Sequence, residues 1–192
     1  MEEKNLNEKE SLELISRMIR NTQRKFEKEH AVPYLVFGYL TVLVAIVVWY
    51  LLSTTRNQQW NLLWLLIPIV GSVILYFANR NSQREVQTFV DRAVSYVWIV
   101  CGVTVFVASF VPTFYVAMPI LFLVALIISM GTTLTGGITR MRLLTVSGSI
   151  GMAAAFFLLS VKGPESILFF AAIFLVTMVI PGHILYAKGR KK

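Results

Sequence analysis

The residues of this chain that could do chemistry are two serines and a histidine in its C-terminal third. Ser147 and Ser149 lie one to two helical turns inside the start of one apolar segment, and His183 lies about one turn inside the end of the next. If the two segments form antiparallel helices, the three side chains lie at a similar depth. A histidine that accepts the proton of a serine hydroxyl makes that oxygen a nucleophile, so one hypothesis is an intramembrane hydrolase.

The sequence around these residues argues against catalysis. Rhomboid proteases also have six core helices, but SerGlySerIleGly (147–151) lacks their glycine-x-serine pattern, and the surroundings of His183 differ from theirs. A proline within a helix has no N–H to donate and leaves a carbonyl of the preceding turn free. We therefore expect His183 to bond a carbonyl freed by Pro181, and we expect the chain not to be an enzyme.

The histidines and the single cysteine give no sign of a cofactor. His30 and His183 both lie near the predicted cytoplasmic ends of their segments, so two helices could together ligate a haem or a metal. No acidic residue or cysteine lies at ligand spacing from them, and two ordinary interfacial histidines are the simpler interpretation. Phosphate loops, dinucleotide fingerprints, zinc motifs and nucleic-acid-binding modules are missing. We expect no cofactor, no metal and no nucleic-acid partner.

The apolar segments carry no Asp, Glu, Lys or Arg in their middles. Ionisable groups inside a membrane typically mark ion paths, proton relays or counter-ions. Their absence argues against a proton-coupled pump, a voltage sensor or an acidic cation site. An apolar groove is still enough to hold a neutral or lipid-like ligand, so the alternative hypothesis is a small carrier or a protein that binds lipids or other hydrophobic molecules.

The residues that could line such a site are small, polar or helix-bending. Ser147, Gly151 and Ala155 recur at steps of four, and small side chains at this spacing let helix backbones approach closely. Tight packing is the simpler interpretation of this face, which could also support self-association. Prolines can break a helix and open a site, although they are also common in membrane helices without one. The candidate ligand or packing residues are Pro68, Gly71, Ser147, Ser149, Gly151, Pro181 and His183.

Six apolar segments must position these residues. The chain has 192 residues, of which 56% are hydrophobic and 15% are charged, a composition too apolar for an ordinary soluble domain. A helix of about twenty apolar residues crosses roughly 30 Å of hydrocarbon. The sequence predicts an all-α integral membrane protein whose transmembrane domain, residues 33–188, is a six-transmembrane-helix bundle of three helical hairpins. The predicted spans are 33–53, 60–78, 93–111, 113–134, 143–161 and 166–187.

Prolines and glycines set the predicted boundaries. Pro33 is expected to end a leading helix, and Pro112 is expected to divide one long apolar run into the third and fourth spans. Gly136 and Gly137 are expected to cap the fourth helix. LysGlyProGlu (162–165) predicts the turn into the sixth span.

The basic residues predict the orientation of the chain. Of its 18 Lys and Arg residues, 16 fall in the N-terminal segment, the loops after the second and fourth spans, and the C-terminal end. Only Arg56 and Lys162 fall on the other side. Positively charged loops stay in the cytoplasm. We therefore expect a multi-pass protein surrounded by membrane lipids, with both termini cytoplasmic and a basic cytoplasmic tail at residues 189–192.

Residues 1–32 predict a cytoplasmic amphipathic helix. Its apolar stripe consists of Leu12, Ile15, Ile19 and Phe26, and basic side chains crowd its second half. The stripe needs a partner, which could be the bilayer interface, the underside of the bundle, another copy of the chain or a soluble protein. A structural role at the interface or against the bundle is the simpler interpretation. A cytoplasmic protein partner or a homo-oligomer would give the helix a function.

The chain as a whole combines this charged leading helix and six short spans with a closing IleProGlyHisIleLeuTyr (180–186) and a basic tail. The combination resembles small bacterial inner-membrane proteins with no assigned activity. The resemblance implies the bacterial cytoplasmic membrane and no substrate. Our leading hypothesis is a non-enzymatic scaffold or regulator that binds a partner through its leading helix.

Overall fold

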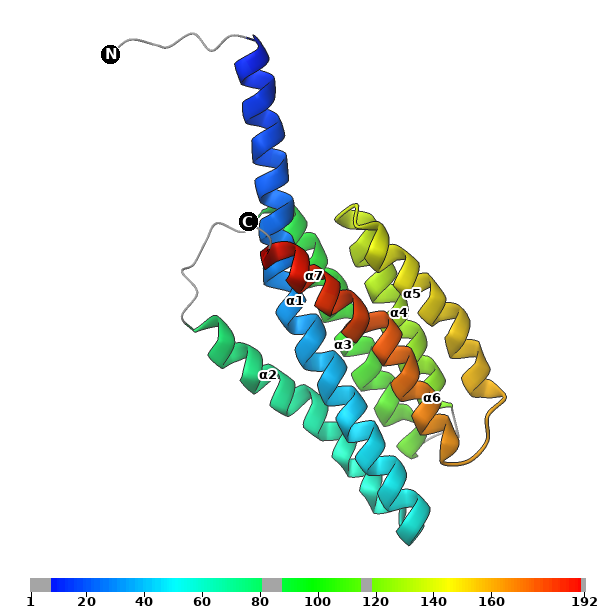
Figure 1. The fold of residues 1–192 in the computed structure, drawn as a ribbon. Helices are drawn as coiled ribbons and strands as arrows, with labels where there is room; N and C mark the ends of the chain where they lie inside the picture. Colours follow the sequence, from blue (N-terminus) through cyan, green and yellow to red (C-terminus); the bar gives the residue numbers. More distant parts are fainter. Residues whose placement is uncertain (1–7, 81–87, 115–118, 191–192) are drawn as a thin grey trace.

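The computed structural model of the chain describes residues 8–80, 88–114 and 119–190, with the side chains of residues 12–13, 31–78, 80, 88–109 and 119–189. Every regular element in these residues is helical (Figure 1). In chain order they are α1 (Glu8–Thr55), the 3₁₀ helix η1 (Gln58–Leu65), α2 (Leu66–Asn79), α3 (Phe89–Phe114), α4 (Ile120–Ile138), α5 (Arg142–Ala155), the 3₁₀ helix η2 (Phe156–Leu159), α6 (Glu165–Phe174), the π-helical turn η3 (Leu175–Val179) and α7 (Ile180–Arg190).

Six helical stretches in the described residues are long and apolar enough to cross a membrane, which agrees with the predicted number. The second combines η1 with α2, the fifth combines α5 with η2, and the sixth combines α6, η3 and α7. The stretches are Ala31–Thr55, Gln58–Ala78, Phe89–Ser109, Ile120–Ile138, Arg142–Leu159 and Glu165–Gly189.

Helix α1 does not break at Pro33, so the predicted boundary there is wrong. The helix is 48 residues long and runs through the proline, which makes the leading segment and the first span one rod. A proline removes one backbone hydrogen bond and tends to kink a helix, but packing on both sides can keep the helix continuous. Ala31 and Tyr34, on either side of Pro33, are both buried in the bundle. The N-terminal part of α1 projects beyond the other helices (Figure 1).

The boundaries of the third and fourth spans also differ from the predicted 93–111 and 113–134. Pro112 lies inside α3, which continues to Phe114, and α4 begins only at Ile120. Pro119 has φ −74° and ψ 80° and precedes the first residue of α4. Helix α3 therefore passes through Pro112, and the second proline of this region marks the start of α4.

Helix α3 begins four residues earlier than predicted because a capping box starts it. The backbone N–H of Thr88 donates to the Asp91 carboxylate at 2.9 Å, and the N–H of Asp91 donates to the Thr88 hydroxyl at 3.2 Å. These bonds satisfy two N–H groups that a helix start leaves without partners. Polar residues that the sequence analysis placed in a loop thus form the first turn of the helix.

The turn between α4 and α5 is capped differently from the prediction. Gly136 and Gly137 both lie within α4, and Arg140 adopts the left-handed conformation with φ 56°. The N–H of Met141 donates to the carbonyl of Gly136 at 2.9 Å, and the N–H of Arg140 donates to that of Gly137 at 3.3 Å. These bonds satisfy carbonyls at the end of the helix. Glycine does take the left-handed conformation in the predicted turn at 162–165, where Gly163 has φ 91°.

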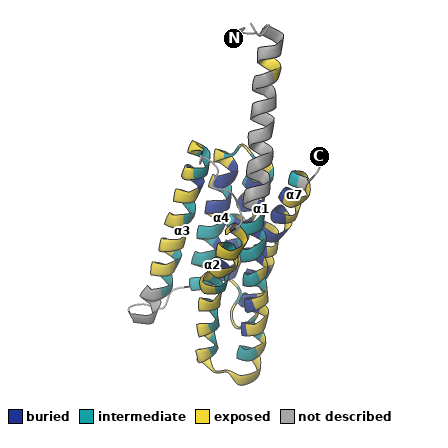
Figure 2. Ribbon diagram, turned by 90° about the vertical axis from the view of Figure 1, so that its left-hand side faces the viewer, coloured by how far each residue is buried: buried dark blue, intermediate teal, exposed yellow. Residues whose placement is uncertain are grey.

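The helices divide into a packed centre and two peripheral members. In the most apolar part of the sixth span 56% of residues are buried, against 6% in the second span and 11% in the third. Helices α4 and α5 make the most extensive contact, followed by α1 with α7, while α2 packs mainly on α1 and α3 on α4. The outer surface of α3 is largely exposed (Figure 2). The strongest contacts therefore join different predicted hairpins.

Candidate functional site

The contact between α1 and α7 contains a side-chain hydrogen bond between two helices that lie far apart in the sequence. The hydroxyl of Tyr39 and Nε2 of His183 lie 2.6 Å apart, and the two rings meet edge to face with centroids 5.7 Å apart. Both side chains are exposed on the outside of the bundle. The expectation that His183 bonds a backbone carbonyl freed by Pro181 is therefore wrong, because a tyrosine from α1 supplies its partner.

The residues before His183 bring α7 close to α1. A Cβ added to Gly182 would lie 3.0 Å from Cγ of Leu35 on α1, and one added to Gly38 would lie 2.9 Å from Cγ2 of Val179. Pro181 is almost completely buried. The Pro-Gly-His sequence thus has a packing role, since its proline fills the core, its glycine allows close approach and its histidine bonds Tyr39.

The two candidate serines and His183 have separate hydrogen bonds. The Ser147 hydroxyl donates to the carbonyl of Leu144 at 3.2 Å, and the Ser149 hydroxyl donates to that of Thr145 at 2.8 Å. Ser147 is buried and Ser149 is exposed, so they lie on different faces of α5. No hydrogen bond joins either serine to the histidine in the described residues, and the arrangement shows no nucleophile paired with a base.

The small residues of α5 are packing positions inside the bundle. A Cβ on Gly148 would clash with the hydroxyl and backbone N of Thr133, and one on Gly151 would clash with the Thr177 methyl and the Ser129 hydroxyl. This is the close helix approach that the spacing predicted. Because Ser147, Gly148 and Gly151 are buried within one chain, this face cannot also form a contact between chains.

A buried group of hydroxyls that was not predicted from the sequence lies where α1, α4 and η3 meet. The hydroxyl oxygens of Tyr34 and Ser129 are fully buried, and that of Ser129 has no hydrogen-bond partner among the described residues. Thr132 and Thr135 lie beside Tyr34 and are 0% exposed, as is Thr177. Each of the three threonines donates its proton to a carbonyl of its own helix, at 2.8 to 3.0 Å. The sequence did contain a signal for this group, because Ser129, Thr132 and Thr135 are spaced to share one face of an apolar span.

The candidate residues on α2 lie apart from those on α5 and α7. A Cβ on Gly71 would clash with the ring of Phe37, so this glycine lets α1 pack on α2. Pro68 is exposed near the start of α2. The structure therefore does not gather Pro68, Gly71, Gly151 and Pro181 into one site, because α2 packs mainly on α1 while α5 packs mainly on α4.

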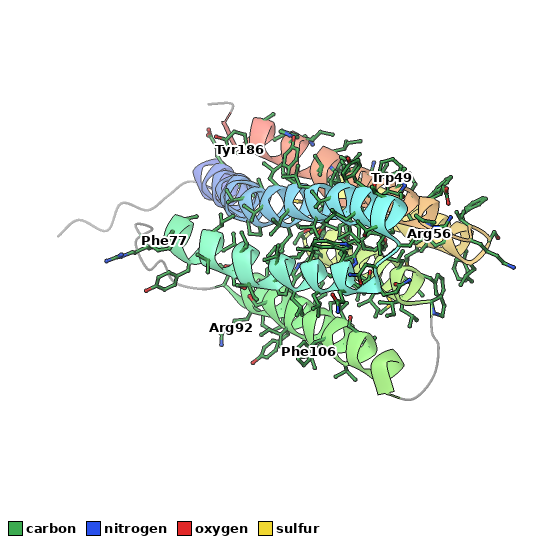
Figure 3. The ribbon with its side chains drawn as sticks, turned by 90° about the horizontal axis from the view of Figure 1, so that it is seen from below. Trp49, Arg56, Phe77, Arg92, Phe106 and Tyr186 are labelled. Atoms are coloured by element: carbon green, nitrogen blue, oxygen red, sulfur yellow. The ribbon has the colours of Figure 1, made fainter. Side chains whose placement is uncertain are left out.

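The C-terminal half of α2 carries an open hollow of about 360 Å³ lined by Ser72, Leu75, Tyr76 and Arg80. In this half α2 diverges from α1 (Figure 1), and the end of the helix near Phe77 lies at the edge of the molecule (Figure 3). Ser72, Tyr76 and Arg80 are exposed. The hollow combines two hydroxyls and a guanidinium with one leucine, which suits an anionic group attached to an apolar chain.

The candidate stripe on the leading segment lies on the projecting part of α1. Leu12 is 67% exposed. The backbone of Ile15, Ile19 and Phe26 is helical, and their side chains, like that of His30, lie outside the described set. Within the described residues no three His, Cys, Asp or Glu side chains lie close enough to hold a metal ion. Cys101 is buried, and its sulfur lies 3.8 Å from the carbonyl oxygen of Ile127.

Comparisons with protein-family models, curated proteins and solved structures find no match to this chain.

Proposed function

We propose that this chain is a non-enzymatic multi-pass protein of the bacterial cytoplasmic membrane that binds a cytoplasmic protein through residues 8–30 of α1. The observation that carries the proposal is the continuity of α1 from Glu8 to Thr55. A helix that lies flat on the membrane, or folds back under the bundle, must bend where it leaves its span. The projecting part of α1 instead continues the first span away from the other helices (Figure 1), which supports a partner outside the bundle.

The composition of the projecting part indicates the kind of partner. The stripe of Leu12, Ile15, Ile19 and Phe26 has the spacing of a helix that docks in an apolar groove. Five basic residues crowd the second half of the leading segment, and their charge favours a partner whose groove has an acidic rim. These are Arg17, Arg20, Arg24, Lys25 and Lys28.

The orientation of the proposal rests on the distribution of charge. Lys and Arg residues concentrate on the side of the bundle that carries both termini, and the opposite side has only Arg56 and Lys162. That asymmetry favours a cytoplasmic location for the projecting part of α1. The docking helix would then be presented to soluble proteins at a fixed height above the membrane.

The local geometry favours this proposal over the two other hypotheses. The hydrolase hypothesis needs a serine beside His183, and the described hydrogen bonds engage these groups with other partners. The carrier hypothesis needs one site between the bent even-numbered spans and the fifth span. The candidate residues instead lie in separate helix contacts, which argues against such a site. Neither hypothesis gives the projecting helix a role.

Site-specific photocrosslinking in intact cells tests the proposal. A photoreactive amino acid is placed at Ile15 or Ile19 of the full chain, on the stripe, and in a matched variant at Leu14. Leu14 is equally apolar but lies about 100° around the helix from Ile15. We expect one discrete cytoplasmic protein to be crosslinked from both stripe positions and much more weakly from Leu14.

The same experiment distinguishes the other partners of the stripe. Crosslinks to lipid alone would contradict the proposal, as would a crosslinked product containing only two copies of this chain. Equal crosslinking from Leu14 and the stripe positions would also contradict it, because a docked helix has one buried face. Replacing Ile15 and Ile19 together by serine should abolish the crosslink formed from a third stripe position, Leu12, without changing insertion of the protein.

A further inference from the structure

We propose that the hollow on α2 binds an anionic phospholipid, with Arg80 and Tyr76 at its phosphate and Ser72 and Leu75 along its glycerol ester and first acyl carbons. The hollow of about 360 Å³ is lined by these four residues. This inference is independent of the partner proposed for α1, and it requires only that α2 lies in a bilayer.

The lining residues are spread along α2, with the one charged side chain at the end of the hollow. At a rise of 1.5 Å per residue, Arg80 lies about 12 Å along the axis from Ser72. Tyr76 and Leu75 lie between them, on the same side of the helix. From Arg80 the lining passes the Tyr76 hydroxyl and Leu75 and reaches the Ser72 hydroxyl, so a phosphate at the charged end would place the ester region and the first acyl carbons beside the other three side chains. An inorganic anion would use only the charged end.

The hollow is open because α2 leans away from the bundle. Helix α2 contacts mainly α1 and η1, and its C-terminal half diverges from α1 (Figure 1). Tyr76 is 68% exposed, and Arg80 is also exposed. Its guanidinium is therefore available to an external anion and can contact a phosphate with two N–H groups.

The surface around the hollow favours a lipid over a soluble phosphate compound. Ile69, Val73 and Phe77 on the same helix are all about half exposed or more. Figure 3 shows Phe77 at the outer end of α2, and Phe106 on the outer side of α3. Apolar side chains so placed are covered by acyl chains in a bilayer. A basic side chain at such an interface attracts anionic headgroups, by about 1 kcal/mol per residue.

Native mass spectrometry of the full chain, titrated with defined lipids, tests the proposal. The probes are phosphatidylglycerol, phosphatidylcholine and the water-soluble sn-glycerol 3-phosphate. We expect phosphatidylglycerol to bind more tightly than phosphatidylcholine, and glycerol phosphate not to be retained. Arg80→Gln should lower the affinity for phosphatidylglycerol about fivefold. Arg80→Lys keeps the charge and should retain most of the affinity, while Tyr76→Phe should cause a smaller loss.

Arg92→Gln is the matched control. Arg92 is exposed on α3, outside the hollow but on the same side of the bundle, and it carries the same charge (Figure 3). Its replacement should leave the affinity for phosphatidylglycerol unchanged. An equal loss for Arg92→Gln would overturn the proposal, because it would mean a general attraction by positive charge. No loss for a folded Arg80→Gln, or binding of glycerol phosphate as tight as that of the lipid, would overturn it too.

Discussion

Gly148 and Gly151 set the distance between α5 and its neighbours. A side chain on Gly151 would meet the Thr177 methyl and the Ser129 hydroxyl, while one on Gly148 would meet the backbone of α4. Backbone atoms cannot move aside without shifting a whole helix, and the side chains that Gly151 faces are themselves buried, so we expect both positions to favour glycine. In a membrane, where apolar burial drives helix association weakly, such close packing is a main source of stability.

Gly151→Ala is expected to destabilise the protein by about 1–3 kcal/mol, because the added methyl overpacks the contact among α4, α5 and η3. Gly102→Ala is the matched control, since this helical glycine of α3 has no other atom within 4 Å of an added Cβ. We expect it to leave stability unchanged or raise it by up to about 1 kcal/mol through helix propensity. Unfolding in mixed micelles measures both, and equal effects would contradict the packing argument.

Ser129 presents the opposite case, a polar group without a partner. Its hydroxyl is fully buried and has no hydrogen-bond partner in the described parts of the chain, whereas that of Ser147 donates to the Leu144 carbonyl. Removing an unpartnered buried hydroxyl removes a cost of about 1–3 kcal/mol. We therefore expect Ser129→Ala to raise the free energy of unfolding and Ser147→Ala to leave it unchanged or lower it. A loss of stability in Ser129→Ala would mean that the hydroxyl has a partner in the bilayer.

Helix α1 joins a projecting segment and a membrane span, which the sequence pattern predicted to be separate helices. Its continuity depends on packing, since Ala31 and Tyr34 are buried on either side of Pro33 and Tyr34 meets Trp98 of α3 edge to face at 5.6 Å. Because α1 also forms the main contacts of α7 and α2, any movement of its projecting part would be transmitted to the bundle through a rigid element.

The length of α1 can be measured in a bilayer by pulsed electron paramagnetic resonance. Spin labels at Leu12 and Thr55, both exposed, should lie about 65 Å apart at 1.5 Å per residue in a continuous helix. If the chain turned at Pro33 to lie flat on the membrane, the separation would be only about 45 Å. Labels at Tyr39 and Thr55, within the span, should give about 24 Å in either case and provide the control. Cys101 is replaced by alanine in all variants.

At the scale of the whole molecule, the bundle has a well-packed centre and an incompletely packed side. Helices α1, α4, α5 and the sixth span bury most of the core, whereas α2 and α3 expose much of their surface (Figure 2). Exposed apolar residues on these two helices are expected to contact lipid. Self-association stays a prediction, and it would have to use a surface other than the small-residue face of α5, which is buried within the chain.

Cysteine accessibility tests the predicted orientation of the bundle. In a Cys101→Ala background, single cysteines at Arg56 or Lys162 should react with a membrane-impermeant maleimide added to intact spheroplasts. Single cysteines at Arg140 or Lys188 should react only after the membrane is opened. The reverse pattern would contradict the cytoplasmic location of the termini and with it the proposed docking role of α1.

The number of apolar helices could be determined from sequence alone, because each needs only a run of apolar residues of sufficient length. The tight packing around Ser147 and Gly151 could be predicted for the same local reason, since residues four apart share a helix face. The boundaries at Pro33 and Pro112 could not be predicted. A proline weakens a helix by a local amount, and whether the helix continues depends on what its flanking residues contact in the folded protein.

The pairing of residues from distant elements was decided only by the tertiary structure. His183 lies 144 residues from Tyr39 along the chain, and no sequence spacing indicates their hydrogen bond. Nor does any sequence spacing indicate that Pro68 and Gly151 lie in separate helix contacts, or that α2 diverges from α1 and leaves Arg80 exposed. Hydrophobic length and charge act on each segment by itself and therefore determine the spans and the expected orientation. Which helices meet depends on the fit of all their surfaces at once, and that fit exists only in the folded chain.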